Sequence, residues 1–284
     1  MEIVTTRKQL RDKIEIWRNE GKVIGFVPTM GALHEGHLSL VEEARKHSDV
    51  VVVSIFVNPT QFNNPDDLKT YPRDLDKDVE MLEKLSVELI FAPTVKEMYP
   101  EEDTRQFDFG NLDKVMEGKF RPGHFNGVAQ VVSKLFDYVN PHKAFFGEKD
   151  FQQLAIIRQL VKDLKMDIEV VGCPIVREPD GLAMSSRNLL LEPEMRKNAP
   201  VIAKTLSESL NFAPGKTVKE TIDLVKKKIN GTGKLEVEYF EIVDGDTLQA
   251  VESWDDSDYI VGCIAVFAGK VRLIDNVTYK QHQS

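Results

Sequence analysis

The chain has 284 residues, of which 42% are hydrophobic and 29% are charged. This composition is typical of a folded globular protein and excludes collagen-like, disordered and membrane-embedded classes. The formal net charge of −9 disfavours a general binder of nucleic acids or anionic membranes, although it leaves room for a local cationic pocket. At roughly 150 residues per domain, the length predicts two domains.

The cysteines and the N-terminal residues predict a cytoplasmic protein. Cys173 and Cys263 are far apart in the sequence and form no CxxC pair, which favours a reducing compartment. Charged residues begin at Glu2, so we expect no secretory signal. The longest apolar stretch, 259–269, is shorter than the ~20 residues that a membrane span needs, and we interpret it as a buried strand.

Short β-rich runs alternate with helical patterns through the first two-thirds of the chain, which predicts a parallel α/β sheet. Strands are predicted at 23–27, 50–57, 88–91, 143–146 and 168–171, and helices at 7–20, 36–47, 75–85, 126–139 and 150–164. The pattern then changes: helices at 193–210 and 218–229 precede strands at 235–243, 259–268 and 270–274. We therefore expect a domain boundary near residue 176 and an α+β domain after it.

The loop after the strand at 23–27 reads PTMGALHEGH and runs into a helix. Free backbone N–H groups and the positive end of the helix dipole make such a point a phosphate site. His34 and His37 are three positions apart, so on a starting helix they share a face and can both donate to one polyphosphate. Gly36 lacks a side chain, which lets a base or ribose lie against the backbone.

Other interpretations of this loop are weaker. An isolated histidine is more often a surface or core residue, and only the strand–turn–helix context favours a nucleotide site. A zinc protease would need HExxH, in which the histidines are four positions apart. Gly215, Lys216 and Thr217 resemble the end of a P-loop, but Leu210 replaces the glycine that the motif requires.

Two further clusters also follow predicted strands, at the edge where open α/β sheets bind ligands. In NPTQF, Gln61 can hydrogen-bond a hydroxylated substrate, or it is an ordinary turn residue. In FGEKD, Lys149 offers a charge for phosphate and Asp150 an acceptor for ribose hydroxyls, unless the cluster only caps a helix. Gln153 lies one turn later and faces back toward the helix start.

A fourth cluster, MSSRN, lies just past the expected boundary. Its two hydroxyls and its guanidinium suit a mobile clamp that closes on a polyphosphate. Arg121 and His124, in a basic turn before a helix, are candidates to join it. Four such clusters at one sheet edge favour a nucleotide site more strongly than any one of them alone.

The runs PTMGALHEGH, NPTQF, YPRD, RPGHF, FFGEKDFQQL and GLAMSSRN, in this order, make the sequence resemble the pantoate–β-alanine ligase family. HxGH alone would indicate only the wider superfamily of nucleotidyltransferases and class I aminoacyl-tRNA synthetases. The resemblance implies a Rossmann-like parallel sheet in an N-terminal domain, 1–176, and a smaller α+β lid domain, 177–284. It further implies a homodimer that joins pantoate to β-alanine through a pantoyl adenylate, with Mg2+ accompanying ATP.

The resemblance also implies roles for single residues. The residues implied to be catalytic are His34, His37, Lys149 and Arg187. The residues implied to bind ATP are Met30, His37, Gly147, Lys149, Asp150, Val176, Met184, Ser185, Ser186 and Arg187. Gln61 and Gln153 would bind pantoate, and Arg121 and His124 would form part of the site wall. Asp78 could approach Mg2+, although its surroundings look equally like a solvated helix start.

Two alternatives remain at this point. A small-molecule adenylyltransferase of the same superfamily would keep the nucleotide on its product and release no AMP. A non-catalytic nucleotide-binding protein would bind ATP without consuming it. An RNA-charging role is disfavoured by the net charge of −9 and by a length that leaves no room for an anticodon domain.

Overall fold

A computed structural model describes residues 1–63 and 65–282, and the chain forms two compact units. Unit 1 comprises Met1–Phe109, Arg121–Glu148 and Gln153–Pro174, and unit 2 comprises Gly110–Phe120, Lys149–Gln152 and Ile175–Ser284. Two short segments, 110–120 and 149–152, therefore group with the C-terminal part of the chain although they lie within the first two-thirds of the sequence. The domain boundary near residue 176 stays a prediction.

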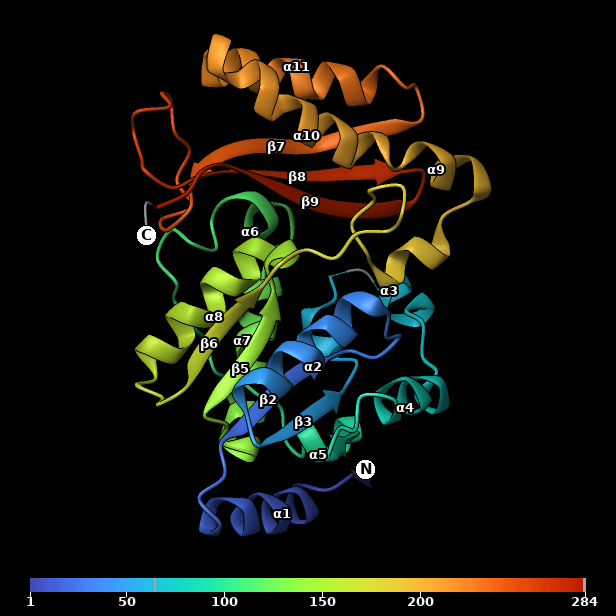
Figure 1. Cartoon of the computed structure of the whole chain (residues 1–284), viewed down its shortest axis with the longest axis vertical. Helices are drawn as coiled ribbons and strands as arrows, with labels where there is room; N and C mark the ends of the chain where they lie inside the picture. The colour runs from blue at the N-terminus through green and yellow to red at the C-terminus, as the bar shows by residue number, and fades with distance from the viewer. Residues whose placement is uncertain (64, 283–284) are drawn as a thin grey trace. The chain divides into compact units, whose positions relative to one another are not determined.

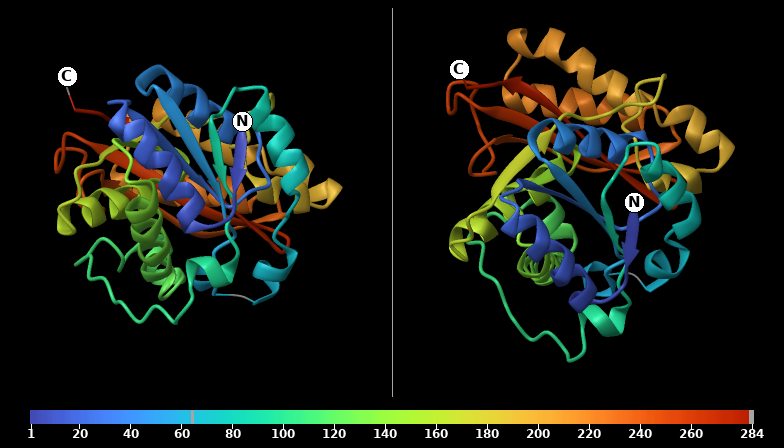
Figure 2. Two further views of the ribbon diagram at one scale, coloured as in Figure 1. Left: turned by 90° about the horizontal axis from the view of Figure 1, so that it is seen from below. Right: turned by 60° about the horizontal axis from the view of Figure 1, so that its bottom comes forward.

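Unit 1 is built on a six-stranded parallel sheet, which confirms the predicted α/β class. The strands are β1 (Glu2–Val4), β2 (Ile24–Thr29), β3 (Val50–Ile55), β4 (Leu89–Phe91), β5 (Lys143–Gly147) and β6 (Glu169–Cys173), in the order β1-β4-β3-β2-β5-β6. Figure 2 shows β1 at the edge of the sheet beside the N-terminus. This strand was not predicted, because three residues are too few to show a period.

The helices of unit 1 include five that begin within two residues of the predicted starts and two short ones, at 65–70 and 95–98, that the sequence pattern does not predict. They are α1 (Arg7–Asn19), α2 (Glu35–His47), α3 (Pro65–Thr70), α4 (Leu75–Glu83), α5 (Val95–Met98), α7 (His124–Val139) and most of α8 (Phe151–Asp163). Helix α2 lies over β2 and β3 (Figure 1). Its Leu38, Val41 and Ala44 join Val53 and Phe145 of the strands in one buried cluster. This apolar packing fixes the start of α2 at the carboxyl edge of the sheet.

Residues 99–115 run as a long loop (Figure 2). Within unit 1, Asp103 anchors this loop to α7, because its carboxylate lies 2.7 Å from an Arg105 nitrogen and 3.3 Å from Lys134 Nζ. Gln130 of α7 donates to the carbonyls of both Asp103 and Arg105. The Arg105 guanidinium holds the pKa of Asp103 well below its usual range.

Unit 2 is built on an antiparallel sheet of β7 (Leu235–Asp244), β8 (Ile260–Ala268) and β9 (Val271–Lys280). Its helices are α6 (Met116–Phe120), α9 (Pro193–Asn198), α10 (Val201–Phe212) and α11 (Val218–Asn230), of which α10 and α11 lie along one side of the sheet (Figure 1). The single helix predicted for 193–210 is wrong. The chain divides there at Pro200, which has no N–H to donate to the preceding turn.

A buried ion cluster holds α6 on the sheet of unit 2. Glu117 accepts two hydrogen bonds from the Arg272 guanidinium, at 2.7 and 2.8 Å, and one from the Tyr239 hydroxyl at 2.8 Å. Arg272 Nε also donates to Glu238 at 2.9 Å. Gln152 accepts from the backbone N–H of Glu117 at 2.9 Å, so segment 149–152 is tied to the same cluster.

Both cysteines are buried. Cys173 ends β6, and Cys263 lies within β8. Burial raises the pKa of Cys173 to about 12 and raises that of Cys263 further. At neutral pH both side chains are therefore thiols of low reactivity.

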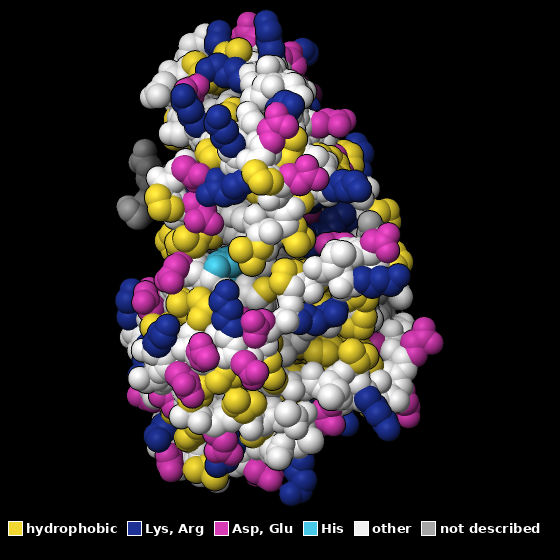
Figure 3. All heavy atoms as spheres, turned by 90° about the vertical axis from the view of Figure 1, so that its right-hand side faces the viewer, with side chains coloured by type: hydrophobic (Ala, Val, Ile, Leu, Met, Phe, Trp, Pro, Cys, Tyr) yellow, Lys and Arg dark blue, Asp and Glu magenta, His cyan; other side chains and the backbone are white. Residues whose placement is uncertain are grey.

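Acidic and basic side chains are interspersed on the face that Figure 3 draws. Such a mixture is typical of an exposed protein surface, because neighbouring charges of opposite sign do not repel one another. Among residues 1–63 and 65–282, no helix combines the length and the apolar character needed to cross a membrane.

Candidate active site

The loop between β2 and α2 has a backbone path that needs particular residues. Gly31 and Ala32 both have positive φ angles, of 78° and 50°. A Cβ on Gly31 would also lie 2.9 Å from a carboxylate oxygen of Asp78, so glycine is required there on two grounds. The side chain of Thr29 accepts a hydrogen bond from the N–H of Gly31 at 3.2 Å. The loop therefore leaves the strand along one fixed path.

Asp78 fixes the middle of this loop. It lies in α4, is only 2% exposed, and accepts hydrogen bonds from the backbone N–H groups of Ala32 at 3.0 Å and Leu33 at 2.7 Å. Burial raises the pKa of the carboxyl, and the two N–H groups partly offset that effect. The residues that the structure describes include no group of three or more His, Cys, Asp or Glu able to hold a metal ion. The approach of Asp78 to Mg2+ stays a prediction.

His34 and His37 lie together at the N-terminus of α2. His34 is the N-cap residue, and its Nδ1 accepts from the N–H of Gly36 at 3.1 Å. An accepting Nδ1 places the proton of the neutral ring on Nε2, so His34 presents an N–H donor on its other edge. The two imidazole centroids are 4.1 Å apart. Two rings and the positive end of the helix dipole thus meet at one point, which suits a polyphosphate.

Gln61 is positioned by a neighbour that the sequence analysis did not select. It ends a short 3-10 helix, Pro59–Gln61, and is 9% exposed. Its Oε1 accepts from Asn58 Nδ2 at 3.2 Å, and its Nε2 lies 3.1 Å from the sulfur of Met30. Asn58 is itself held in place, because it donates to the carbonyl of Gly127 and accepts from the Tyr99 hydroxyl. Gln61 therefore offers its N–H donors on the side of Met30.

The turn at 121–124 packs against the same segment. His124 begins α7 and is 6% exposed, and its Nδ1 lies 2.8 Å from the carbonyl oxygen of Gln61. Arg121 is half-buried, and its backbone carbonyl accepts from the N–H of His124. A Cβ on Gly127 would lie 2.4 Å from the carbonyl oxygen of Thr60. The helix and the Gln61 segment can therefore approach this closely only because residue 127 is a glycine.

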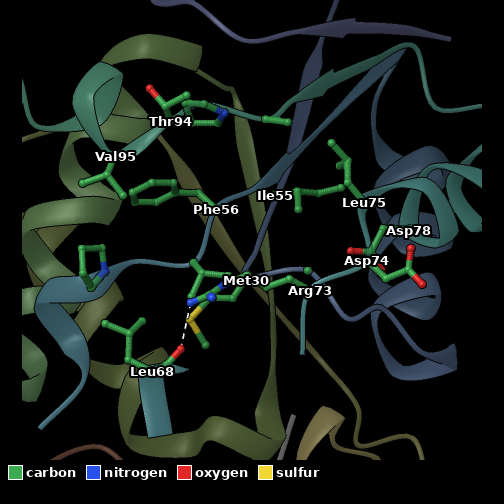
Figure 4. Close-up of a pocket in the computed structure, with 15 residues that line it drawn as sticks. Met30, Ile55, Phe56, Leu68, Arg73, Asp74, Leu75, Asp78, Thr94 and Val95 are labelled. Atoms are coloured by element: carbon green, nitrogen blue, oxygen red, sulfur yellow. Dashed lines mark hydrogen bonds between the residues drawn. The ribbon is translucent and has the colours of Figure 1, made fainter. Parts of the chain in front are cut away.

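A cavity of about 520 Å3 opens in unit 1 beyond the carboxyl ends of β2, β3 and β4 (Figure 4). Met30 and Asp78 are the two predicted site residues that line it, together with apolar side chains such as Ile55 and Phe56. Arg73 also lines the cavity and donates to the carbonyl of Leu68 at 2.8 Å. The cavity lies where open α/β sheets usually bind their ligands, beyond the carboxyl ends of the strands.

Lys149 and Asp150, in unit 2, belong to a 3-10 turn between β5 and α8. The Lys149 ammonium lies 3.4 Å from the Asp150 carboxylate, and the Lys149 side chain is 18% exposed. Gly147 ends β5 in unit 1, and a Cβ there would contact no atom within 4 Å. The neighbouring Gln153, also in unit 1, is half-buried at the start of α8.

Val176 and Met184 face each other in a short hairpin of unit 2, because the N–H of Met184 donates to the carbonyl of Val176 at 3.0 Å. Ser185 follows and caps a 3-10 helix, Ser186–Leu190, by accepting from the N–H of Arg187. Ser186 is 7% exposed, and Arg187 is half-buried. The predicted clamp residues therefore lie at the N-terminal end of one short, capped element.

The sequence profile of the family described as pantoate-beta-alanine ligase matches residues 2–278. The chain belongs to the pantoate–β-alanine ligase family. It is 57% identical over 281 residues to a pantothenate synthetase of Bacteroides fragilis, which covers 99% of this chain and 100% of that relative. It is also 59% identical over 281 residues to a pantothenate synthetase of Phocaeicola vulgatus, with the same coverage.

Solved structures of this ligase family share the whole fold. A pantothenate synthetase from Thermus thermophilus superposes with a TM-score of 0.92 at 44% identity, covering 99% of this chain and 100% of that one. A pantoate-beta-alanine ligase from Francisella tularensis, complexed with beta-gamma ATP and beta-alanine, has a TM-score of 0.83 at 38% identity, covering 99% of each chain.

Within this ligase-family fold, no sequence motif singled out Asn58, which contacts Gln61, or Asp275, which pairs with Arg177. Asn58 stands within the quoted NPTQF run, and an asparagine before a proline is a common helix cap, so a local signal was present. Asp275 stands in a β-strand pattern far from every motif, and its bond to Arg177 is a contact between residues 98 positions apart. No local signal could have shown that pairing.

Proposed function

We propose that this chain joins pantoate to β-alanine in two steps, with pantoyl adenylate as the intermediate and with AMP and pyrophosphate as the other products. Membership of the pantoate–β-alanine ligase family supports the reaction. The observation that carries the proposal is the His34–His37 pair at the N-terminus of α2, on a loop that Asp78 fixes. The Francisella relative, whose crystal structure is a complex with beta-gamma ATP and beta-alanine, supports those two substrates.

In the first step, an oxygen of the pantoate carboxylate attacks the α-phosphorus of ATP. The bond from that phosphorus to the bridging oxygen breaks, and the electron pair leaves with pyrophosphate. Negative charge grows on the departing group, so fixed N–H donors and cations accelerate the step without acid–base chemistry. We assign this stabilisation to His34, His37, Lys149 and Arg187.

The remaining residues hold the nucleotide and pantoate. We assign the ribose to Gly147 and Asp150, the adenine to the backbone around Val176 and Met184, and further phosphate contacts to Ser185 and Ser186. Met30 lines the site. Gln61 and Gln153 would bind pantoate, with Arg121 and His124 in the wall. For Gln61 the direction of its amide supports a donor role toward a hydroxyl or carboxylate of pantoate.

We propose that Mg2+ enters as part of the MgATP substrate. Magnesium usually keeps several waters and is bound through substrate phosphates and one or two carboxylates, so a dedicated protein cage is not needed. The carboxylate of Asp78 already accepts two backbone hydrogen bonds, which leaves it limited capacity for a further ligand.

In the second step, the neutral amine of β-alanine attacks the acyl carbon of the adenylate and AMP leaves. Water would hydrolyse this mixed anhydride, so we propose that the domain 177–284 acts as a lid. We also propose that the protein is a cytoplasmic homodimer. Light scattering at micromolar concentration would test the assembly, since a monomeric mass contradicts it.

Exchange of labelled pyrophosphate into ATP, with pantoate and Mg2+ present and β-alanine absent, tests the first step alone. We expect exchange that requires pantoate, followed by equal amounts of AMP and pantothenate when β-alanine is added. Product formation without free AMP would instead indicate an adenylyltransferase. ATP binding without exchange for any carboxylic acid offered would contradict the ligase assignment.

A further inference from the structure

Two adjacent residues of β9, Asp275 and Asn276, contact the Lys149 segment and the hairpin that leads to Ser185, both in unit 2. Asp275 is 4% exposed and Asn276 is 8% exposed. The backbone N–H of Asn276 donates to Asp275 Oδ1 at 2.8 Å, so the Asp275 carboxylate is held against the main chain of its neighbour. Neither residue belongs to any motif of the sequence analysis.

The first contact is to the hairpin that precedes Ser185. Asp275 accepts two hydrogen bonds from the guanidinium of Arg177, at 2.7 and 3.0 Å. This fork arrangement fixes direction as well as distance. Arg177 pairs with Ala183 across the hairpin and donates to the carbonyl of Gly181 at 3.1 Å. The guanidinium therefore ties both sides of the hairpin to β9, and the Ser185 cap begins directly after it.

The second contact is to Lys149. Asn276 Nδ2 donates to the backbone carbonyl of Lys149 at 3.2 Å. This bond fixes the main chain at Lys149 and leaves the ammonium group to be directed elsewhere. The bonded residues, 149 and 276, are neighbours in space only because of the fold of unit 2.

We propose that Asp275 and Asn276 are positioning residues that set the place of Lys149 relative to the Ser185–Arg187 segment, so that both can bind one triphosphate. The inference deepens the proposed function and rests on it for the identity of the ligand. Two cationic groups and two hydroxyls on separate loops bind one polyanion more tightly when their spacing is fixed before binding. A shared attachment to one rigid strand provides that fixed spacing.

The expected effect falls on ATP and spares pantoate. Asn276→Ala removes one neutral hydrogen bond, for which we expect the KM and the calorimetric Kd for MgATP to rise about 2- to 10-fold. Asp275→Asn leaves the Arg177 guanidinium without its counter-charge, and we expect a rise of about tenfold or more. The KM for pantoate in the exchange assay should change less than twofold in both variants.

Tyr279→Phe is the matched control. It lies on the same strand and also loses a partly buried hydrogen bond, at 2.6 Å, but its partner, Ser209, belongs to α10 and to neither phosphate segment. If Asp275 and Asn276 have a purely structural role, all three variants should lower the melting temperature, and all three should have the same affinity for MgATP. The positioning role predicts weakened ATP binding in the two anchor variants only. Arg177→Lys, which keeps the charge but loses the fork, replaces Asp275→Asn if that variant fails to fold.

Unchanged MgATP affinity in Asn276→Ala and in the folded Asp275 or Arg177 variant overturns the proposal. Equal weakening in Tyr279→Phe also overturns it. Calorimetry separates this outcome from failure of the proposed function. Wild-type protein that binds MgATP but catalyses no exchange contradicts the ligase assignment alone, whereas wild-type protein that does not bind MgATP overturns both.

Discussion

The loop of unit 1 that carries His34 and the hairpin of unit 2 that leads to Ser185 are both fixed by a buried aspartate, but in different ways. Asp78 accepts from two backbone N–H groups, which offset its burial more than the charge of Lys77 does. Asp275 accepts from a guanidinium. A carboxylate can therefore position a loop through neutral dipoles or through a charge, and the two arrangements should respond differently to the same substitution.

The largest effect should come from the donor that the unit 1 loop presents. We expect His34→Ala to lower the rate of pyrophosphate exchange by about 100- to 1000-fold, because one fixed donor to the leaving group is lost. His34→Asn is the informative partner variant. Asparagine can still cap α2, so this variant should retain the wild-type melting temperature and yet stay as slow as His34→Ala. Near-normal exchange in either variant would contradict the role of His34.

The ion cluster of unit 2 should give the next largest effect, on stability. We expect Glu117→Ala to lower the free energy of unfolding by about 3 kcal/mol, because the mostly buried Arg272 guanidinium loses its main partner. The double substitution Glu117→Met with Arg272→Met should be milder, since it removes both charges. Urea unfolding measures both. A double variant less stable than the single one would refute this explanation.

The same change at the two anchoring aspartates tests the comparison directly. In unit 1, Asp78→Asn should cost about 1–3 kcal/mol of stability, because the amide nitrogen cannot accept and leaves one loop N–H unsatisfied. It should raise the KM for both pantoate and ATP. Asp275→Asn should raise the KM for ATP alone. If the two variants change the KM values for pantoate and ATP in the same way, the two aspartates do not position their loops differently.

A smaller effect concerns pH. The pKa of Asp103 is lowered in the folded protein, so the unfolded state binds a proton more readily than the folded state does. Asp103 therefore contributes its full share to the free energy of unfolding above about pH 4, the usual pKa of an aspartate. That share is lost as the pH falls below this value. We expect Asp103→Asn to flatten the fall in stability between about pH 4 and pH 2. If stability falls just as steeply with decreasing pH in this variant, the Asp103 carboxylate does not cause that fall.

Much of unit 1 could be predicted from the sequence because its features are local. A continuous apolar strand, a glycine-containing loop and an amphipathic helix placed His34 and His37 at the sheet edge, and the structure has β2, the loop and α2 there. The short helices α3, α5 and α6 were not predicted, because four to six residues show no reliable period. Pro200 is visible in the sequence as a helix breaker, and it divides the run 193–210 that was predicted as one helix.

The supports of the site could not be predicted, because they depend on tertiary pairing. Asp78 lies among alternating charges that look like a solvated helix start, yet it is 2% exposed and bonded to a loop 45 residues away. Asn58 matters through its contacts with Tyr99 and Gly127, which only the folded chain brings to it. Sequence patterns thus predicted the residues proposed to contact substrate more readily than the residues that position those side chains.

The burial of both native thiols makes the chain a convenient subject for fluorescence. Neither Cys173 nor Cys263 should react with maleimide dyes at neutral pH, since both are buried and both have raised pKa values. One exposed cysteine introduced into each unit would then be labelled selectively, with no need to replace the native residues. A dye pair at such positions would report the separation between the units during turnover, in real time and on single molecules.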